Sequence, residues 1–452
     1  MAISMPPGFR WGVGTSAYQI EGGRHAGGKG ESIWDRFAHT PGTILGSETG
    51  DVACDHYNRW SEDIRLMAEL GVTSYRFSIA WTRILPEGVG ATNPAGLSFY
   101  DRLVDELLAA GIAPWVTLYH WDLPQALEDR GGWRSRETVD AFVRYADVVS
   151  VALGDRVKHW ITQNEPWVAA FAGHLEGVHA PGLRDWPAAL AAGHHLLLSH
   201  GQAVPVIRAN SVGSEVGIAL DCRPSTPASG APADLDAQRH FDGFRNRWFF
   251  DPVFGRGYPQ DMVDGYRERG RFQSERPPFG LPGDQEEIGV PIDFLGVNYY
   301  TSLTAAAGSD ETESTGIAPG PHPLPGFTEM GWRITPDALT EFLVRINSEY
   351  QPPKIVITEN GASFGDGPGS DGTVRDQRRI DYLYQHLVAV RAAIDRGVPI
   401  DGYFVWSLLD NFEWSLGYSQ RFGLVWVDHA TGERIPKQSY HWYADLIEAN
   451  RA

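Results

Sequence analysis

Strand-like and helix-like stretches alternate along the 452 residues of this chain, and this alternation limits its folds more than any other feature. The helical stretches space their apolar residues three or four apart and end near a glycine, as residues 139–153 do before Gly154. Eight strands alternating with helices predict the α/β class and a parallel sheet closed into a (β/α)8 TIM barrel. The eight apolar, β-prone runs are Phe9–Thr15, Ser74–Ala80, Ala113–His120, Val157–Gln163, Val216–Asp221, Ile292–Asn298, Lys354–Thr358 and Asp401–Ser407.

An open, doubly wound sheet is the competing fold, but it usually carries a glycine-rich phosphate loop that leads into a helix after the first strand. Gly12-Val13-Gly14-Thr15 is only a fragment of such a loop, and we expect no helix after it. A plain barrel needs about 250 residues. We expect the excess in long βα loops after strands five to seven, which would form the rim of the active site. Since no stretch resembles an interdomain linker, residues 1–452 should form a single catalytic barrel domain. The loop candidates, rich in Pro, Gly and Ser, are Arg223–Ala233, Pro277–Gly289, Ala305–Gly326 and Ser363–Gly372.

Charge and cysteine content exclude several kinds of partner. The formal charge is −19, with 38 basic against 57 acidic residues, so nucleic acid and anionic membranes would be repelled. Cys54 and Cys222 are too few for a disulfide framework. Residues 1–10 lack the pattern of a signal peptide, and no run approaches about 18 consecutive apolar residues. These features predict a cytoplasmic protein that binds neither nucleic acid nor a membrane.

Two glutamates stand where β-prone runs are broken. They occur in Thr162-Gln163-Asn164-Glu165-Pro166 and in Ile357-Thr358-Glu359-Asn360-Gly361. Because Pro and Asn-Gly usually bound buried strands, both carboxyl groups are expected at the C-terminal mouth of the barrel. Cleavage of a glycosidic bond needs such a pair, since one carboxyl group protonates the leaving oxygen while the other attacks the sugar or activates water.

Polar and aromatic side chains also stand at the ends of other predicted strands. His120 ends the third strand, Asn298 ends the sixth, and Trp406 lies near the end of the eighth, while Arg76 lies inside the second. Sugar hydroxyls need hydrogen-bond donors and acceptors, and the C–H face of a sugar ring needs an aromatic surface. The combination predicts a sugar-binding cavity at the mouth of the barrel.

The chain resembles family 1 glycoside hydrolases of the β-glucosidase type from Phe9-Arg10-Trp11-Gly12 to Val427-Asp428. Asn164-Glu165-Pro166, Thr358-Glu359-Asn360-Gly361 and the opening segment from Gly12 to Gly22 carry this resemblance. It implies a retaining, exo-acting β-glucosidase in which Glu165 is the general acid and base and Glu359 is the nucleophile that forms a covalent glycosyl-enzyme. Two carboxyl groups suffice for this reaction, so we expect no metal site and no cofactor.

The resemblance also implies a set of substrate-binding residues. Arg76 would support Glu359 by favouring its ionised form, and the charge of Glu359 would help to keep Glu165 protonated. Trp167, His179 and Trp332 would face the aglycone, with packing inside the protein as the alternative explanation for these three. The residues expected to bind the sugar are Gln19, His120, Trp121, Asn164, Asn298, Tyr300, Trp406, Glu413, Trp414 and Phe422.

The expected substrate is a small carbohydrate with a terminal, unphosphorylated β-D-glucoside, such as a cello-oligosaccharide or an aryl or alkyl β-glucoside. Phosphoglycosidases of the family usually carry a serine and a lysine after strand eight. This chain has Asn411-Phe412-Glu413-Trp414 there, and a carboxylate would repel phosphate. Since the same residues often tolerate galactose or fucose, β-galactosidase and β-fucosidase side activities are also expected.

Alternative functions share this scaffold. A transglycosidase uses the same catalytic residues, and a catalytically weak sugar-binding protein would share the cavity. The long rim loops favour a deep pocket over the groove of an endo-acting hydrolase. A metal-dependent barrel hydrolase is disfavoured, because no His-x-His follows the first strand and His194-His195 lies in an Ala/Leu-rich helical stretch. The sequence leaves the oligomeric state open.

Overall fold

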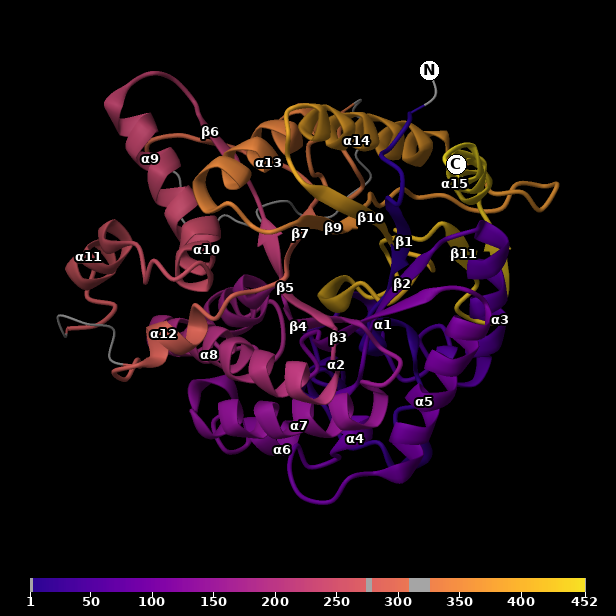
Figure 1. Cartoon of the computed structure of the whole chain (residues 1–452), viewed down its shortest axis with the longest axis horizontal. Helices are drawn as coiled ribbons and strands as arrows, with labels where there is room; N and C mark the ends of the chain where they lie inside the picture. The colour runs from indigo at the N-terminus through magenta and orange to yellow at the C-terminus, as the bar shows by residue number, and fades with distance from the viewer. Residues whose placement is uncertain (1–2, 274–278, 309–325, 452) are drawn as a thin grey trace.

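The computed structural model describes residues 3–273, 279–308 and 326–451. In this part of the chain, eight parallel strands close into a barrel in the order β1-β10-β9-β7-β5-β4-β3-β2, and helices surround it (Figure 1). The predicted (β/α)8 barrel is therefore confirmed, and every strand ends within two residues of its predicted run. The barrel strands are β1 (Arg10–Gly14), β2 (Ser74–Ser78), β3 (Ala113–Tyr119), β4 (His159–Asn164), β5 (Glu215–Cys222), β7 (Phe294–Tyr299), β9 (Ile355–Asn360) and β10 (Ile400–Trp406).

The longer helices cover the outside of the barrel with their apolar faces, as α7 does by burying Val139, Phe142 and Val149. No helix within the described ranges has the length and apolarity that crossing a membrane requires. The longer helices are α3 (His56–Leu70), α5 (Pro94–Ala109), α7 (Glu137–Leu153), α8 (Trp186–Asn210), α9 (Pro232–Asp242), α13 (Pro336–Tyr350), α14 (Gln377–Asp395) and α15 (Gln438–Ala449).

Shorter elements lie in the connections between the strands. A one-turn helix, α1 (Ala17–Ile20), follows β1, so the expectation that no helix stands there was wrong. Two π-helical segments are η4 (Val168–Glu176) and η5 (Gly243–Arg247). Short 3-10 helices are η1 (Ala26–Gly28), η2 (Leu45–Ser47), η3 (Gly132–Arg134) and η7 (Trp414–Leu416). The other short α-helices and strands are α2 (Ile33–Ala38), α4 (Trp81–Ile84), α6 (Gln125–Glu128), α10 (Trp248–Val253), α11 (Gln260–Glu268), α12 (Asp284–Ile288), β6 (Ser225–Pro227), β8 (Leu303–Ala305), β11 (Val425–Val427) and β12 (Arg434–Pro436).

The stretches expected to form the rim differ in where they lie. Residues 223–233 leave the C-terminal end of β5 and contain β6, which pairs with β8. Residues 279–289 instead contain α12, which precedes β7 and lies beside α8 at the side of the barrel (Figure 1). No described residue of this stretch lines the cavity at the mouth, so its assignment to the rim was wrong. Most of Ala305–Gly326 lies outside the described residues.

Apolar side chains fill the inside of the barrel beneath its mouth. The Trp115 ring stacks on His159 at the start of β4, and its centroid lies 5.2 Å from the rings of both Phe294 and Phe404. A side chain at Gly12 would overlap the Phe404 ring, so this glycine of the opening segment makes room for the aromatic rings inside the barrel. We call the set the apolar plug; its fully buried members are Trp115, Ile161, Ala219, Phe294, Val356 and Phe404.

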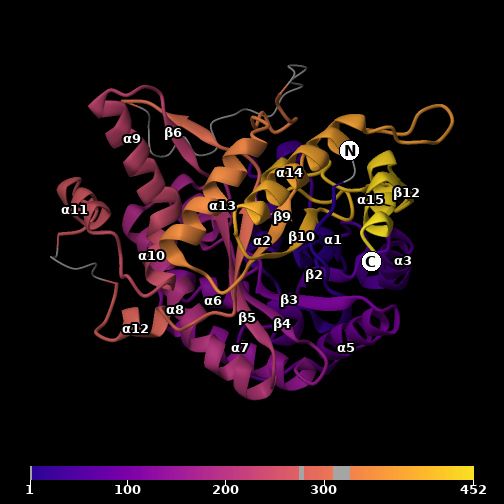
Figure 2. The ribbon, with the colours of Figure 1, turned by 45° about the horizontal axis from the view of Figure 1, so that its top comes forward.

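The two ends of the described chain meet beside β1. Helix α15, which ends the described chain, lies next to α3 (Figure 2). The backbone N–H of Met5 donates to Asn450 Oδ1 at 2.9 Å, and the Tyr443 hydroxyl donates to the Gly12 carbonyl at 3.2 Å. These contacts fix β1, from which the segment carrying Gln19 leaves the barrel.

Candidate active site

A cavity of about 290 Å³ lies at the C-terminal ends of the strands, above the apolar plug. Four residues predicted for the site, Gln19, Arg76, Asn164 and Asn298, are not part of its wall. They lie directly behind the wall and hydrogen-bond to residues that line it. The predicted residues that do line the cavity are His120, Trp121, Glu165, Trp167, His179, Tyr300, Trp332, Glu359, Trp406, Glu413, Trp414 and Phe422.

Glu359 is the last residue but one of strand β9, and each of its carboxyl oxygens accepts a hydrogen bond. Arg76, fully buried on β2, donates from Nη1 to Oε1, and the Tyr300 hydroxyl donates to Oε2 at 2.6 Å. Burial raises the pKa of Glu359 above its ordinary value, while the charge of Arg76 and the hydrogen bond from Tyr300 act in the opposite direction. The two donors hold this carboxyl group in one orientation and offset part of the effect of burial on its pKa.

Glu165 is in a different environment immediately after β4. Its backbone has φ 48°, in the left-handed region that non-glycine residues rarely adopt, and this turn directs the side chain into the cavity. Asn298 Nδ2 donates to Oε1 at 2.8 Å. Burial, followed by the negative charges of Glu359 and Asp221, raises the pKa of Glu165 well above its ordinary value. The cavity therefore presents Glu359 and Glu165 in different environments, and Glu165 is the one held more strongly in its neutral form.

Asn164 connects the supports of the two glutamates. Its Oδ1 accepts hydrogen bonds from Arg76 Nη2 at 2.5 Å and from Asn298 Nδ2 at 3.0 Å. Its Nδ2 lies 3.1 Å from His120 Nε2. Burial, followed by repulsion from Arg76, lowers the pKa of His120 well below its ordinary value, so that its imidazole is neutral. His120 Nδ1 is buried, and no described residue hydrogen-bonds to it.

The loop after β10 contributes Glu413 and Trp414 to the cavity. Gln19 Nε2 donates to the Phe412 carbonyl at 2.9 Å and lies 3.5 Å from Glu413 Oε2. Burial, followed by the charge of Glu359, raises the pKa of Glu413 to about 8. The ring of Trp414 lies 4.6 Å from that of Trp121, and together they form an aromatic side of the cavity.

Residues 1–452 match the sequence model described as Glycosyl hydrolase family 1. The chain belongs to this family. The family 1 enzyme is 48% identical over 446 residues to β-glucosidase A of Thermotoga maritima, with 98% of each chain covered. It is 43% identical over 484 residues to the bifunctional β-D-glucosidase/β-D-fucosidase of Bifidobacterium breve, with both chains covered completely. The solved family 1 β-glucosidase from Thermotoga maritima superposes with a TM-score of 0.93 over 99% of both chains, at 48% identity.

The candidates for the aglycone side line the outer part of the cavity of this glycoside hydrolase. The ring of Trp332 lies 5.4 Å from Tyr300, and His179 lies 5.3 Å from Trp121. Burial lowers the pKa of His179 to about 4, so that its ring is neutral. Trp167, at the start of η4, packs against Phe171 with ring centroids 5.6 Å apart. All three rings both pack within the protein and face the cavity, so the two explanations given for them are not exclusive.

Sequence reasoning missed several residues of the wall. Asp221 ends a predicted strand, so the signal that singled out His120 and Asn298 could have found it. Arg245, in contrast, comes from η5, far along the chain from any strand end, and only folding brings it to Glu165. The lining residues that were not predicted are Val168, Ala172, Val178, Asp221, Cys222, Arg223, Arg245, Thr301, Met330, Ser415 and Leu416.

The two adjacent histidines of α8 lie outside the site. His194 Nε2 is 2.9 Å from Asp284 Oδ2, and His195 Nδ1 is 2.8 Å from the Trp133 carbonyl. Across the described ranges, His, Cys, Asp and Glu side chains do not form a group of three or more that could hold a metal ion. These histidines are buried helix positions with hydrogen-bond partners from the protein.

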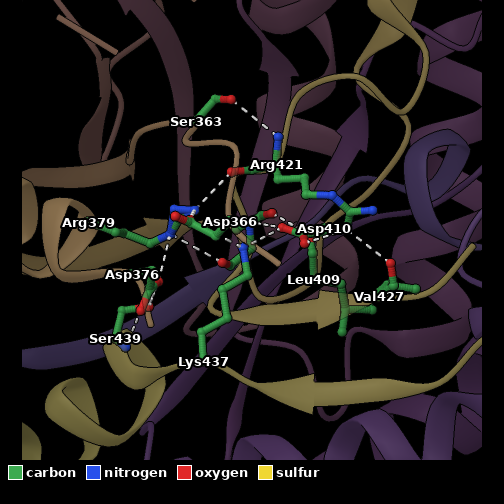
Figure 3. A network of polar contacts seen from close by, with 12 residues as sticks. Ser363, Asp366, Asp376, Arg379, Leu409, Asp410, Arg421, Val427, Lys437 and Ser439 are labelled. Carbon is green, nitrogen blue, oxygen red and sulfur yellow. Dashed lines mark hydrogen bonds and ion pairs between the residues drawn. The ribbon is translucent and has the colours of Figure 1, made fainter. Parts of the chain in front are cut away.

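A buried ionic network anchors the loop that carries Glu413 and Trp414 (Figure 3). Lys437 Nζ lies 2.8 Å from Asp410 Oδ1, and Arg421 Nη1 lies 2.8 Å from Asp410 Oδ2. Burial, followed by repulsion from Arg379, lowers the pKa of Lys437 to about 8. Burial alone would raise the pKa of Asp410, but Lys437, Arg421 and Arg379 together hold it below its ordinary value. Asp410 and Arg421 stand at the two ends of the loop, so these ion pairs hold both ends in place.

Lys437→Met is expected to lower the free energy of unfolding by about 3 kcal/mol, since it leaves the buried Asp410 carboxylate with Arg421 as its remaining close cation. Urea unfolding measures this loss. The double variant Lys437→Met/Asp410→Asn is the control, because it removes the charge that the single variant leaves uncompensated, and it should recover part of the loss. A single variant as stable as the parent would show that the ion pair does not stabilise the fold.

Proposed function

We propose that the chain is a retaining, exo-acting β-glucosidase that hydrolyses terminal, unphosphorylated β-D-glucosides, including cello-oligosaccharides and aryl or alkyl β-glucosides. One observation carries the proposal. Among the carboxyl groups of a single cavity, Glu359 has a guanidinium and a phenol on its oxygens, whereas Glu165 has only an amide on one of them. Family membership supports both the hydrolysis of a glycoside and the retaining course.

In the proposed reaction, the ionised Glu359 attacks the anomeric carbon while the protonated Glu165 donates its proton to the leaving oxygen. The hydrogen bonds from Arg76 and Tyr300 orient the attacking carboxylate. Formation of the glycosyl ester then neutralises Glu359, which removes one of the charges that raise the pKa of Glu165. Glu165 consequently accepts a proton from the incoming water, and this water releases glucose with its original configuration.

The wall of the cavity supports the proposed sugar-binding roles. Glu413 and the unpartnered His120 Nδ1 offer hydrogen bonds to hydroxyl groups, and Trp406, Trp414 and Phe422 offer apolar surface. Gln19, Asn164 and Asn298 would act on the sugar from behind the wall or through the residues that they hold.

The expected repulsion of a phosphorylated sugar by the Glu413 carboxylate is weakened in the free protein. Because the pKa of Glu413 is about 8, its carboxyl group is mostly protonated at neutral pH in the free protein. Exclusion of phosphate would then follow from the lack of a cation paired with Glu413 among the described residues, rather than from repulsion by a carboxylate. Among the described residues of the wall, the arginines are Arg223 and Arg245, which lie on the side of Trp332 and Trp167.

Side activity toward β-fucosides is supported by the bifunctional relative, and activity toward β-galactosides stays a prediction. No observation favours the sugar-binding protein or the transglycosidase over the hydrolase. We also propose that the chain is one catalytic domain, which is supported by barrel strands that extend from residue 10 to residue 406 and by the contact between its ends. The cytoplasmic location and the lack of nucleic-acid partners stay predictions from the sequence.

Hydrolysis of p-nitrophenyl β-D-glucoside, followed by NMR before mutarotation, tests the proposal. β-Glucose should appear first, because two displacements at the anomeric carbon restore the original configuration. If α-glucose appeared first, the enzyme would be inverting and Glu359 would not be a nucleophile. If neither the glucoside nor the corresponding fucoside and galactoside were hydrolysed, the proposed substrate class would be wrong.

A further inference from the structure

An ion pair lies in the wall of the cavity, and no step of the proposed reaction uses it. Asp221 is the last residue but one of β5, Arg245 lies on η5, and both line the cavity. Their side chains are 10% and 4% exposed, and Arg245 Nη2 contacts Asp221 Oδ2. The guanidinium carbon of Arg245 also lies 3.4 Å from the ring centroid of Trp167. Two opposite charges are therefore fixed in the interior next to the cavity.

The pairing of β4 with β5 places Asp221 near Glu165. Asn164 is aligned with Ala219, and the backbone N–H of Glu165 donates to the Ala219 carbonyl at 2.8 Å. Because side chains alternate along a strand, Asp221 points to the same side of β5 as Ala219, which belongs to the apolar plug. Asp221 therefore lies inside the barrel, two residues closer to the mouth than Ala219, in the cavity that also contains Glu165.

Stability does not account for the pair. A buried ion pair usually stabilises a fold no more than apolar side chains of the same volume. Within the described part of the chain, Nε and Nη1 of Arg245 have no hydrogen-bond partner, whereas Asp410 has both Lys437 and Arg421. The charges do act on Glu165, because charges interact more strongly in the protein interior than in water.

Glu165 is affected by both ends of the pair. Burial and the charge of Glu359 are the largest causes of its raised pKa, and the charge of Asp221 is the next. Arg245 lowers the pKa of Glu165, by less than Asp221 raises it. Other charged or titratable groups nearby, which stay unchanged in the test below, are Arg76 on β2, His120 after β3, His179 after η4, Cys222 and Arg223 at the end of β5, Tyr300 after β7 and Glu413 after β10.

Building on the proposed β-glucosidase activity, we propose that the Asp221–Arg245 pair sets the upper limit of the pH range in which the enzyme is active, by acting electrostatically on Glu165. Neither residue makes or breaks a bond. Both are positioning residues that act through Glu165, which must be protonated to donate to the leaving oxygen. Asp221 extends the protonated range of Glu165 to higher pH, and Arg245 limits this extension while it compensates the buried carboxylate.

The test follows kcat/KM for p-nitrophenyl β-D-glucoside against pH in the parent, in Asp221→Asn, in Arg245→Gln and in the double variant. Asp221→Asn leaves the charge of Arg245 uncompensated, so its alkaline decline should move to lower pH by roughly one pH unit. Arg245→Gln leaves the carboxylate uncompensated and should move the decline to higher pH. The double variant should fall between Asp221→Asn and the parent, because the two effects oppose each other. Arg245→Lys keeps the charge and should retain most of the parent profile.

The acid decline provides an internal comparison. It belongs to Glu359, whose pKa depends chiefly on burial, on Arg76 and on Tyr300, with Asp221 as a weaker influence. In Asp221→Asn, the acid decline should therefore move less than the alkaline decline. Arg239→Gln is the matched control, since this exposed arginine of α9 pairs with Asp261 and does not line the cavity. Its profile should coincide with that of the parent.

Thermal unfolding of each variant checks that the fold is kept. If Asp221→Asn does not fold, because it buries an uncompensated guanidinium, the comparison of Arg245→Gln with the double variant isolates the same carboxylate. The inference fails if the alkaline declines of the variants and the parent coincide. It also fails if Asp221→Asn and Arg245→Gln move the decline in the same direction, as a general disturbance of the site would. Failure of the proposed function would be distinct, since the parent would then not hydrolyse the glucoside at any pH.

Discussion

Replacing Glu359 by alanine should lower kcat for aryl β-glucosides by roughly 10⁴-fold or more. The variant loses the carboxylate that would form the covalent bond, while Arg76 and Tyr300 still occupy the positions from which they contact it. Added azide should restore turnover, because a small anion fits the space left by the side chain and is attracted by Arg76. The product should be the α-glucosyl azide, since a single displacement inverts the anomeric configuration.

Steady-state kinetics and NMR of the azide product measure both effects. Glu341→Ala, which removes an exposed carboxylate from α13, is the control and should neither lose activity nor respond to azide. Thermal unfolding should accompany the kinetics, because removal of Glu359 leaves the buried Arg76 without its ion pair. Unchanged turnover, or a β-glucosyl azide as the product, would contradict the role proposed for Glu359.

Glu165→Ala should discriminate between leaving groups. For cellobiose, whose leaving sugar needs a proton, kcat/KM should fall by roughly 10³-fold, whereas 2,4-dinitrophenyl β-glucoside should lose less than roughly tenfold in this parameter. The reason is that a stable phenolate leaves without proton donation. Azide should here yield the β-glucosyl azide, because it replaces water in the second displacement. Equal losses on both substrates would rule out proton donation by Glu165.

The pH dependence of kcat/KM gives a second test of the role of Glu165, with the same variant. Glu165 must be protonated for the first step, so kcat/KM of the parent should fall as pH rises through the pKa of this residue. Burial and the charges of Glu359 and Asp221 raise that pKa, which places the alkaline decline well above the ordinary range of a glutamate. Glu165→Ala should lose this decline with the activated substrate while keeping the acid decline that belongs to Glu359.

The sequence was sufficient for the strands and for the two glutamates because both follow local rules. Buried strands are apolar runs that end at breakers, and Glu165 and Glu359 lie at such ends. Composition also identified residues 277–289 as a connection, but it could not tell which end of a strand a connection occupies. Arg245 escaped notice because no local pattern marks a π-helical arginine that tertiary packing brings against Trp167.

The sequence also could not predict the hydrogen-bond partners of the polar residues in the site. The resemblance assigned Gln19, Asn164 and Asn298 to the sugar, and this stays a prediction, but the sequence did not indicate that they also hydrogen-bond to Glu413, His120 and Glu165. Motifs report which residue types are present, but the order in which side chains lie between the barrel wall and the cavity depends on the packing of several strands at once.

The apolar plug closes the inner end of the cavity, so the cavity opens only at the mouth of the barrel. With Trp115, Phe294 and Phe404 filling the barrel below, a molecule that enters from the mouth must leave by the same opening. In the proposed binding mode, glucose would occupy the deepest position with the aglycone between it and solvent, so the aglycone would depart first and glucose last. Free glucose would then compete with the next substrate for one entrance, and we expect accumulated product to slow turnover.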